Sequence, residues 1–196
     1  MPPDVTRRTV IAALASLPLG SAAASPSAPR AVAAPGSKVL VAYFSRSGNT
    51  RVIAGLLQRA FQADLFEIVP ATAYPDEYLA TVEEARQERD RDAARPLRAT
   101  VAHLAPYDTV YLGFPIWGTT APPVIKGFLK AHDLAGKQVV PFITHGGYGL
   151  GDSQAVLRRL APQARFGSPF SMQADQERQT MERVNDWLTP QRSTTS

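Results

Sequence analysis

Between residues 38 and 188 the chain alternates apolar runs with amphipathic runs, and this order restricts the fold more than any other feature of the sequence. Apolar runs typical of buried strands lie at 38–45, 64–70, 109–117 and 137–147, with a weaker one at 166–173. Helices with one apolar face are predicted at 50–62, 122–132, 152–162 and 175–188. Repeated strand–helix units indicate an α/β fold, in which an open parallel sheet is covered by helices on both faces.

One long segment departs from this alternation. Residues 71–96 are rich in charge, and the apolar stripe that they offer is thin: Leu79, Val82 and Ala85. Such a segment is typical of a solvated helix on the surface. The alternative is a flap near a ligand, with Tyr74 and Tyr78 as contacts.

The sequence SRSGNT, residues 45–50, lies where the first strand passes into the first helix. Open parallel sheets bind ligands at the carboxyl ends of their strands, and a helix N-terminus attracts anions through its unpaired N–H groups and its dipole. Ser45, Ser47 and Thr50 add hydroxyl donors. Gly48 lets the backbone come close to a ligand, and Asn49 is expected to cap the helix. The loop therefore predicts a phosphate cradle.

This cradle suits a monophosphate ester better than a nucleoside triphosphate. Neither G-x-x-x-x-G-K-[ST] nor G-x-G-x-x-G follows the first strand, and the loop has no lysine for outer phosphates. The later sequence GGYGLGD has Asp152 where a dinucleotide fingerprint needs its last glycine. Asp152 is instead expected to be the N-cap of the helix that follows.

The first 33 residues resemble an export signal. Arg7 and Arg8 precede an apolar run at 10–19, which is shorter than the roughly 20 residues that span a bilayer. Small residues that suit cleavage follow this run. The arginine pair favours the twin-arginine route, and an ordinary secretory signal is the alternative. We therefore expect an exported protein, periplasmic or extracellular, without stable insertion in the membrane.

Composition excludes several kinds of site and partner. The chain has no cysteine, so it forms no disulfide, thiolate metal site or iron–sulfur cluster. Its formal charge of +4 falls to +2 when the first 33 residues, with their three arginines and one aspartate, are left out. No basic patch alternates with aromatic residues, so no nucleic-acid partner is expected. We also find no spacing of residues typical of metal ligands.

The chain resembles the flavodoxin family from residue 38 to about residue 188. Its sequence SRSGNT matches the S/T-x-S/T-G-N-T loop that holds the phosphate of FMN in that family. The sequences GFPIWGTTAPP and PFITHGG stand where the family has its two flavin-binding loops, after the third and fourth strands. The resemblance implies a flavodoxin-like open five-stranded parallel sheet of order 2-1-3-4-5, and FMN as the cofactor.

The resemblance assigns roles to the residues of these three loops. The residues implied to hold the phosphate are Ser45, Arg46, Ser47, Gly48, Asn49 and Thr50, with Arg46 acting mainly through its backbone N–H. Those implied to line one side of the isoalloxazine ring are Pro115, Ile116, Trp117 and Gly118. Those implied to line the other side or the pyrimidine edge are Thr144, His145, Gly146 and Gly147. The alternatives are a core position for Trp117 and a solvent position for His145; His103 and His132 are expected at the surface.

The export signal and the resemblance together divide the chain, and the resemblance implies its function. Residues 1–33 form the export signal and the start of a linker, 34–37 the rest of the linker, 38–190 the FMN-binding domain and 191–196 a disordered tail. We expect electron transfer or a small oxidoreductase, a monomer or a dimer, whose partner is a redox protein or a small acceptor such as a quinone. An NAD(P)H-dependent quinone reductase and a non-enzymatic flavin-binding or sensing module are the alternatives. Electron-carrier flavodoxins are usually strongly acidic, and this chain is slightly basic.

Overall fold

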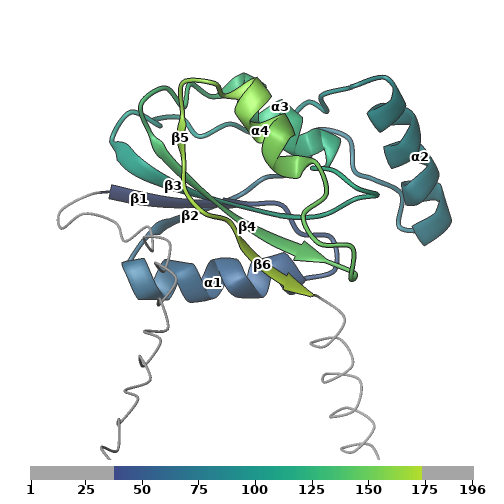
Figure 1. The fold of residues 1–196 in the computed structure, drawn as a ribbon, viewed down its shortest axis with the longest axis horizontal. Coiled ribbons are helices and arrows are strands. Elements are labelled where there is room, and N and C mark those ends of the chain that lie inside the picture. Colours follow the sequence, from purple (N-terminus) through teal and green to yellow (C-terminus); the bar gives the residue numbers. More distant parts are fainter. Residues whose placement is uncertain (1–37, 174–196) are drawn as a thin grey trace, which may run out of the picture.

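A computed structural model describes residues 38–173 of the chain (Figure 1). Its strands are β1 (Lys38–Tyr43), β2 (Asp64–Glu67), β3 (Tyr107–Pro115), β4 (Gln138–His145), β5 (Arg165–Phe166) and β6 (Phe170–Gln173). Its helices are α1 (Asn49–Phe61), α2 (Tyr78–Asp90), α3 (Pro123–Ala131) and α4 (Ser153–Leu160). The predicted strands and helices of this range are present, with ends that differ by a few residues. The predictions for the export signal, the linker, the closing helix and the tail lie outside the described residues.

The strands form one parallel sheet in the order β2-β1-β3-β4-β5, which confirms the predicted order. The predicted fifth strand is split in two. Its first part, β5, pairs with the beginning of β4, and its second part, β6, pairs in parallel with the end of β4. Pro169 lies between the two parts. Because proline has no N–H to donate, it interrupts the ladder of hydrogen bonds there.

Helices cover both faces of the sheet, as predicted (Figure 1). Along β1 successive side chains point to opposite faces. Leu40 and Ala42 join the core that contains residues of α3 and α4, whereas Val39 and Val41 join the smaller core under α1. Because β1, β3 and β4 run parallel, their carboxyl ends lie at one edge of the sheet, between the two helical layers.

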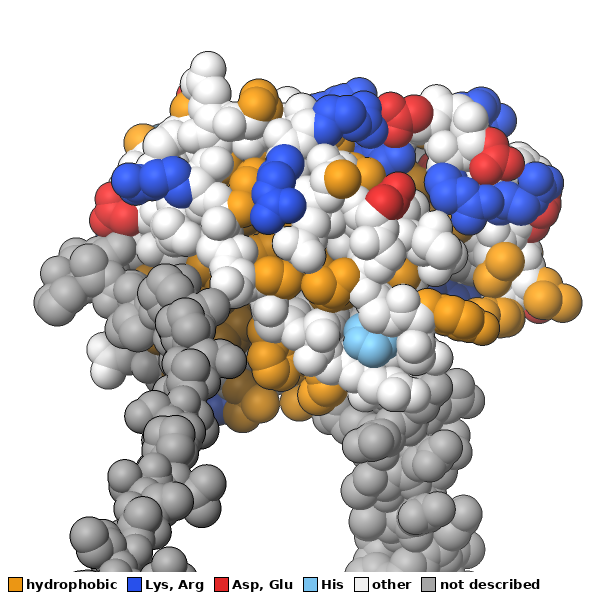
Figure 2. Space-filling model, viewed as in Figure 1, with side chains coloured by type: hydrophobic (Ala, Val, Ile, Leu, Met, Phe, Trp, Pro, Cys, Tyr) orange, Lys and Arg blue, Asp and Glu red, His pale blue; other side chains and the backbone are white. Residues whose placement is uncertain are grey.

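The charged segment 71–96 contains α2, which stands beside the layers rather than within them (Figure 1). Side chains of both charges gather over α2 (Figure 2), and Thr81 is its buried residue. The prediction of a solvated surface helix is therefore correct for most of its side chains. No helix in residues 38–173 has the length and apolar character needed to cross a membrane.

Candidate functional site

Three loops meet at the carboxyl edge of the sheet, after β1, β3 and β4. The hydroxyl groups of Thr50 and Thr144 lie 2.9 Å apart and form a buried hydrogen bond between the first and third of these regions. The N–H of Ile116 donates to the carbonyl of Thr144 at 2.8 Å, and the N–H of Asp152 donates to the carbonyl of Thr119 at 2.9 Å. The structure thus brings together the three regions in which the sequence predicted a site.

The loop after β1 leaves the beginning of α1 open to an anion. Gly48 occupies the N-cap position in the left-handed region, with φ of 95°, and no side chain caps the helix. No acidic residue lies in its first turn. The N–H of Gly48 donates to Oγ of Ser45 at 3.1 Å, which holds the loop in shape. A helix N-terminus without a capping side chain or an acidic residue fits the predicted phosphate cradle.

One detail of the predicted cradle was wrong. Asn49 was expected to cap α1, but it is the first helical residue, and Gly48 stands at the cap. The physical reason is the left-handed backbone at this position, which glycine adopts without steric cost. A Cβ added at Gly48 would meet no atom within 4 Å, so the backbone conformation, and not lack of space, favours glycine here.

The hydroxyl pair of Thr50 and Thr144 lies at the base of the cradle. Each residue is 1% exposed. Either hydroxyl can be the donor in this pair. The hydroxyl that accepts keeps its own hydrogen, which it can donate to a further group. Ser47, by contrast, is exposed at the surface of the loop.

Arg46 joins the phosphate loop to the start of α2. Its Nη2 donates to the carbonyl of Asp76 at 2.8 Å, and more weakly to the carbonyl of Pro75 at 3.4 Å. These contacts hold the guanidinium group at the backbone just before α2. The arrangement is compatible with the predicted role of Arg46, which is to hold an anion through its backbone N–H.

Trp117 is both packed and accessible. Its ring lies edge-on to Phe44, with centroids 5.3 Å apart, and edge-on to Tyr74, with centroids 4.7 Å apart. A tight turn holds it, because the N–H and the carbonyl of Trp117 both bond with Thr120. The interpretation of Trp117 as a core residue is therefore correct in part, since Trp117 is partly buried and packs against the main core. The same residue also lines a pocket.

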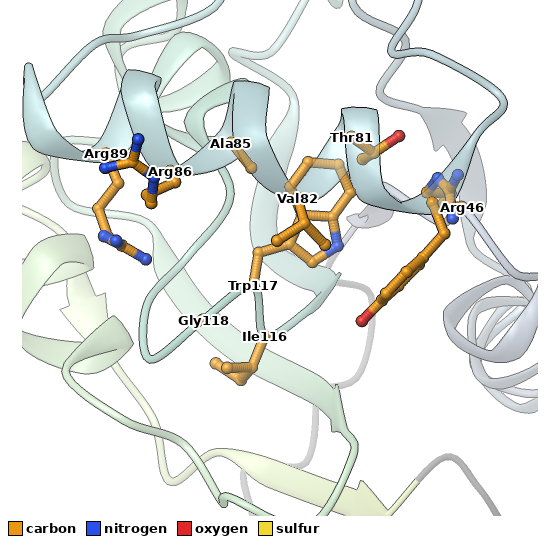
Figure 3. Close-up of a pocket in the computed structure, with 10 residues that line it drawn as sticks. Arg46, Thr81, Val82, Ala85, Arg86, Arg89, Ile116, Trp117 and Gly118 are labelled. Atoms are coloured by element: carbon orange, nitrogen blue, oxygen red, sulfur yellow. The ribbon is translucent and has the colours of Figure 1, made fainter.

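This pocket, of about 220 Å³, lies between α2 and the segment 116–118 (Figure 3). Its lining residues outside α2 are Arg46, Ile116, Trp117 and Gly118. Those that α2 contributes are Tyr78, Thr81, Val82, Ala85, Arg86 and Arg89. Of the two tyrosines named for the flap interpretation, Tyr78 lines this pocket, whereas Tyr74 packs edge-on against Trp117 and is not among the lining residues. The flap interpretation itself stays a prediction.

Most of the α2 residues in the pocket were missed by the sequence analysis. Val82 and Ala85 belong to the thin apolar stripe and do face the pocket, but Leu79 of that stripe is exposed. In the sequence, Arg86 and Arg89 are typical of the solvated charges of a surface helix. The signal that could have identified them is their spacing, since residues three and four apart share one face of a helix.

Ion pairs with a buried arginine attach α2 to the rest of the protein. The side chain of Arg95 is 7% exposed, and its Nη1 donates to Glu84 at 2.6 Å and to Glu88 at 2.8 Å. The guanidinium group also bonds with the carbonyl of Thr72 and lies 3.8 Å from the centroid of the Tyr74 ring. Burial acts to lower the pKa of Arg95, but its partners, Glu84 first among them, raise it overall. Burial, together with Glu88, raises the pKa of Tyr74.

The loop after β4 is rich in glycine and is held by His145. Nδ1 of His145 accepts hydrogen bonds from the N–H groups of Gly147 at 3.1 Å and Gly149 at 3.4 Å. His145 is half-buried, so it does not extend freely into solvent. Gly151 has φ of 53°, and a Cβ there would lie 1.8 Å from the carbonyl oxygen of Thr119, so only glycine allows the third loop to pack on the second.

The structure divides the predicted ring-binding residues into two groups. Ile116, Trp117 and Gly118 line the pocket beside α2, and Pro115 ends β3 just before them. Thr144, His145, Gly146 and Gly147 are not among its lining residues, although Thr144 is bonded to Ile116. The loop after β4 therefore borders the same edge of the sheet outside this pocket.

The two histidines expected at the surface have different positions. His103 is exposed, but His132 is half-buried. Nε2 of His132 accepts from the N–H of Val101 at 2.9 Å, which leaves Nδ1 to donate to the carbonyl of Phe128 at 2.8 Å. Burial lowers the pKa of His132. In residues 38–173 no group of three or more His, Asp and Glu side chains is placed to hold a metal ion.

A family model and two solved structures that are similar to this chain agree with one another. A family model described as Flavodoxin matches residues 38–190. The chain is 33% identical to a protein of Bacteroides uniformis ATCC 8492, described as a candidate flavoprotein, over 70% of this chain and 91% of that one, with a TM-score of 0.65. It is 31% identical to a similarly described protein of Bacteroides eggerthii DSM 20697, over 78% and 96% of the two chains, with a TM-score of 0.64.

A more distant structure has the same fold. It is a flavoprotein of Lactobacillus acidophilus NCFM in complex with FMN, 19% identical over 74% of this chain and 97% of that one, with a TM-score of 0.63. Curated proteins gave no match.

Proposed function

Because the chain belongs to the flavodoxin family, we propose that it binds FMN at the carboxyl edge of its sheet and acts in electron transfer or as a small oxidoreductase. The observation that carries this proposal is the beginning of α1, where Gly48 stands at the N-cap and no side chain or acidic residue satisfies the first turn. Such a helix end is suited to the phosphate of a flavin mononucleotide. FMN, when bound, supplies the redox chemistry, and the protein supplies binding and access.

Residues of three loops would bind FMN together. Residues 45–50 hold the phosphate, with backbone N–H groups at the start of α1 and the hydroxyls of Ser47 and Thr50 as donors. Segment 115–118 provides the apolar and aromatic wall that a flat ring needs, with Trp117 held in place by Phe44 and Tyr74. Segment 144–147 provides backbone groups at the other side.

The proposed location is outside the cytoplasm. Arg7 and Arg8 stand directly before an apolar stretch, and small residues follow it. A twin-arginine route fits an FMN protein, because it exports proteins that are already folded. Export would separate this protein from cytoplasmic reductases.

The experiment that tests the function compares FMN with riboflavin, which lacks the phosphate. The full-length chain should retain FMN on purification and bind it at least about tenfold more tightly than riboflavin, because charge-assisted hydrogen bonds are the strong kind. Ser47→Ala should weaken the binding of FMN by about 1–2 kcal/mol and leave the binding of riboflavin nearly unchanged. Ser168→Ala is the matched control, since Ser168 is also exposed but lies between β5 and β6. Equal affinities for FMN and riboflavin would contradict the proposed cradle.

The pocket beside Trp117 favours an oxidoreductase over a pure carrier, because it gives a small molecule a place beside the ring-binding loop. Turnover of NAD(P)H with a quinone by the FMN-loaded protein would support a quinone reductase. Transfer of electrons to a protein partner, but not to quinones, would support a carrier. Binding of FMN without either activity would support a module that stores or senses flavin.

A further inference from the structure

The pocket between α2 and segment 116–118 is lined by arginines that the phosphate cradle does not account for. Three arginines line it, and no carboxylate side chain belongs to its lining. Figure 3 shows Arg86 and Arg89 on one side of Trp117 and Arg46 on the other. The beginning of α1 is the predicted place for the FMN phosphate, so these guanidinium groups remain to be explained.

The arginines of α2 differ in how strongly carboxylates already hold them. Arg86 donates to Glu83 through Nε at 2.9 Å and through Nη2 at 2.8 Å, and to Asp90 through Nη1 at 3.2 Å. Arg89 forms one ion pair, in which its Nη2 donates to Asp90 at 3.3 Å. Nη1 of Arg89 lies over the backbone of Gly118, 2.7 Å from the place where a Cβ would stand. Arg89 is therefore the arginine of α2 that is directed at the ring-binding loop and is less committed to a carboxylate.

Apolar groups complete the pocket. Trp117, Ile116, Val82 and Ala85 line it together with the arginines. The volume of about 220 Å³ is below the roughly 300–1,000 Å³ that is usual for drug-sized ligands. This space suits a molecule with a single aromatic ring, and it is too small for a whole dinucleotide. A flat apolar wall beside a guanidinium group also matches a ring that carries an acidic substituent.

We propose that this pocket binds a small aromatic carboxylate, with Arg89 as the group that recognises the carboxylate and Trp117 as the wall beside the ring. A guanidinium group pairs with a carboxylate through two parallel hydrogen bonds, which gives both affinity and orientation. Gly118 is part of this arrangement, because any side chain there would displace Arg89. The inference deepens the proposed function and rests on it: the ligand would use the side of segment 116–118 that faces α2, and the flavin ring the side that faces residues 144–147, which are not in the pocket lining.

The test uses the full-length, FMN-loaded protein with benzoate and its neutral counterpart benzamide as probes. Binding is measured by calorimetry and by the change in the visible absorbance of the flavin. We expect benzoate to bind about tenfold or more tightly than benzamide, because its hydrogen bonds with Arg89 are charge-assisted. Arg89→Gln should remove this difference. Arg91→Gln, at the C-cap of α2 and outside the pocket lining, makes the same change of charge and should preserve it.

Several outcomes would overturn the inference. Equal binding of benzoate and benzamide by the wild-type protein, or no binding of benzoate, would show that the pocket does not recognise a carboxylate. An unchanged preference in Arg89→Gln would assign recognition to another group. Weaker FMN binding in Arg89→Gln would show that the pocket holds the cofactor instead. Failure of the proposed function is visible separately as protein without FMN, and calorimetry with the two probes still tests the pocket in that case.

Discussion

Thr50 and Thr144 form a buried hydroxyl pair whose energy can be measured by a double-mutant cycle. The two oxygen atoms are 2.9 Å apart, and each residue is 1% exposed. Replacing one threonine by valine keeps a similar shape but leaves the other hydroxyl buried without its partner, which costs about 1–3 kcal/mol. Replacing both removes two polar groups at once and can be nearly neutral. The double variant should therefore be more stable than either single variant.

The assay is urea unfolding of the FMN-free protein, with the midpoint and the slope determined for the wild type and for Thr50→Val, Thr144→Val and the double variant. Thr100→Val is the control, because Thr100 is exposed in the loop before β3. We expect the control to stay within about 0.5 kcal/mol of the wild type. If the two single losses add up in the double variant to within about 0.5 kcal/mol, the hydroxyls do not depend on each other, and the reasoning is refuted.

The same variants separate the structural role of the pair from its role toward FMN. Thr50 is in the first turn of α1, whereas Thr144 is in β4 beneath it. Without Thr144 the hydroxyl of Thr50 can still donate to a phosphate. We therefore expect Thr50→Val to weaken the binding of FMN by about 1–2 kcal/mol, and Thr144→Val to weaken it less. Riboflavin should be affected little by either change.

Two further predictions concern acid and export. Burial lowers the pKa of His132, so the folded protein binds this proton less readily than the unfolded chain. Its stabilising contribution is complete above the ordinary value of about 6.5 and is lost as the pH falls below it. Urea midpoints between about pH 5 and 7.5 should thus fall more steeply toward acid in the wild type than in His132→Gln, and parallel curves would exclude His132 as the cause. Joint replacement Arg7→Lys and Arg8→Lys keeps the charge and should hold the FMN-loaded protein in the cytoplasm, as measured by cell fractionation; unchanged export would indicate an ordinary secretory signal.

The sheet could be predicted because its signals are local. The central strands β1, β3 and β4 are short apolar runs, and α3 has an apolar face of its own. The split of the fifth strand was not predicted, although the sequence contains a signal for it, since Pro169 lies within the predicted strand. What local signals did not decide is the helix cap, where Gly48 and Asn49 are both suitable residues. The left-handed backbone of the loop assigns that position to glycine.

The wall of the pocket could not be predicted in the same way. The position of α2 depends on pairs between charged residues that are far apart in the chain, and no periodicity reveals such pairs. Asp92, just after α2, bonds with Lys126 of α3 at 2.8 Å and with Arg159 of α4 at 3.0 Å. In isolation these residues are ordinary charges of a polar protein. Their hydrogen bonds, with that of Arg159 foremost, lower the pKa of Asp92.

These contacts also determine how the pocket can open. Arg46 binds the backbone just before α2, Asp92 binds α3 and α4 just after it, and Arg95 binds the helix from below. Between these points α2 buries little apolar surface, with Thr81 as its buried residue. A segment with few apolar contacts opens at a lower free energy than the core of the same protein. Arg46 is also a residue of the phosphate loop, so the pocket wall and the cradle share this contact.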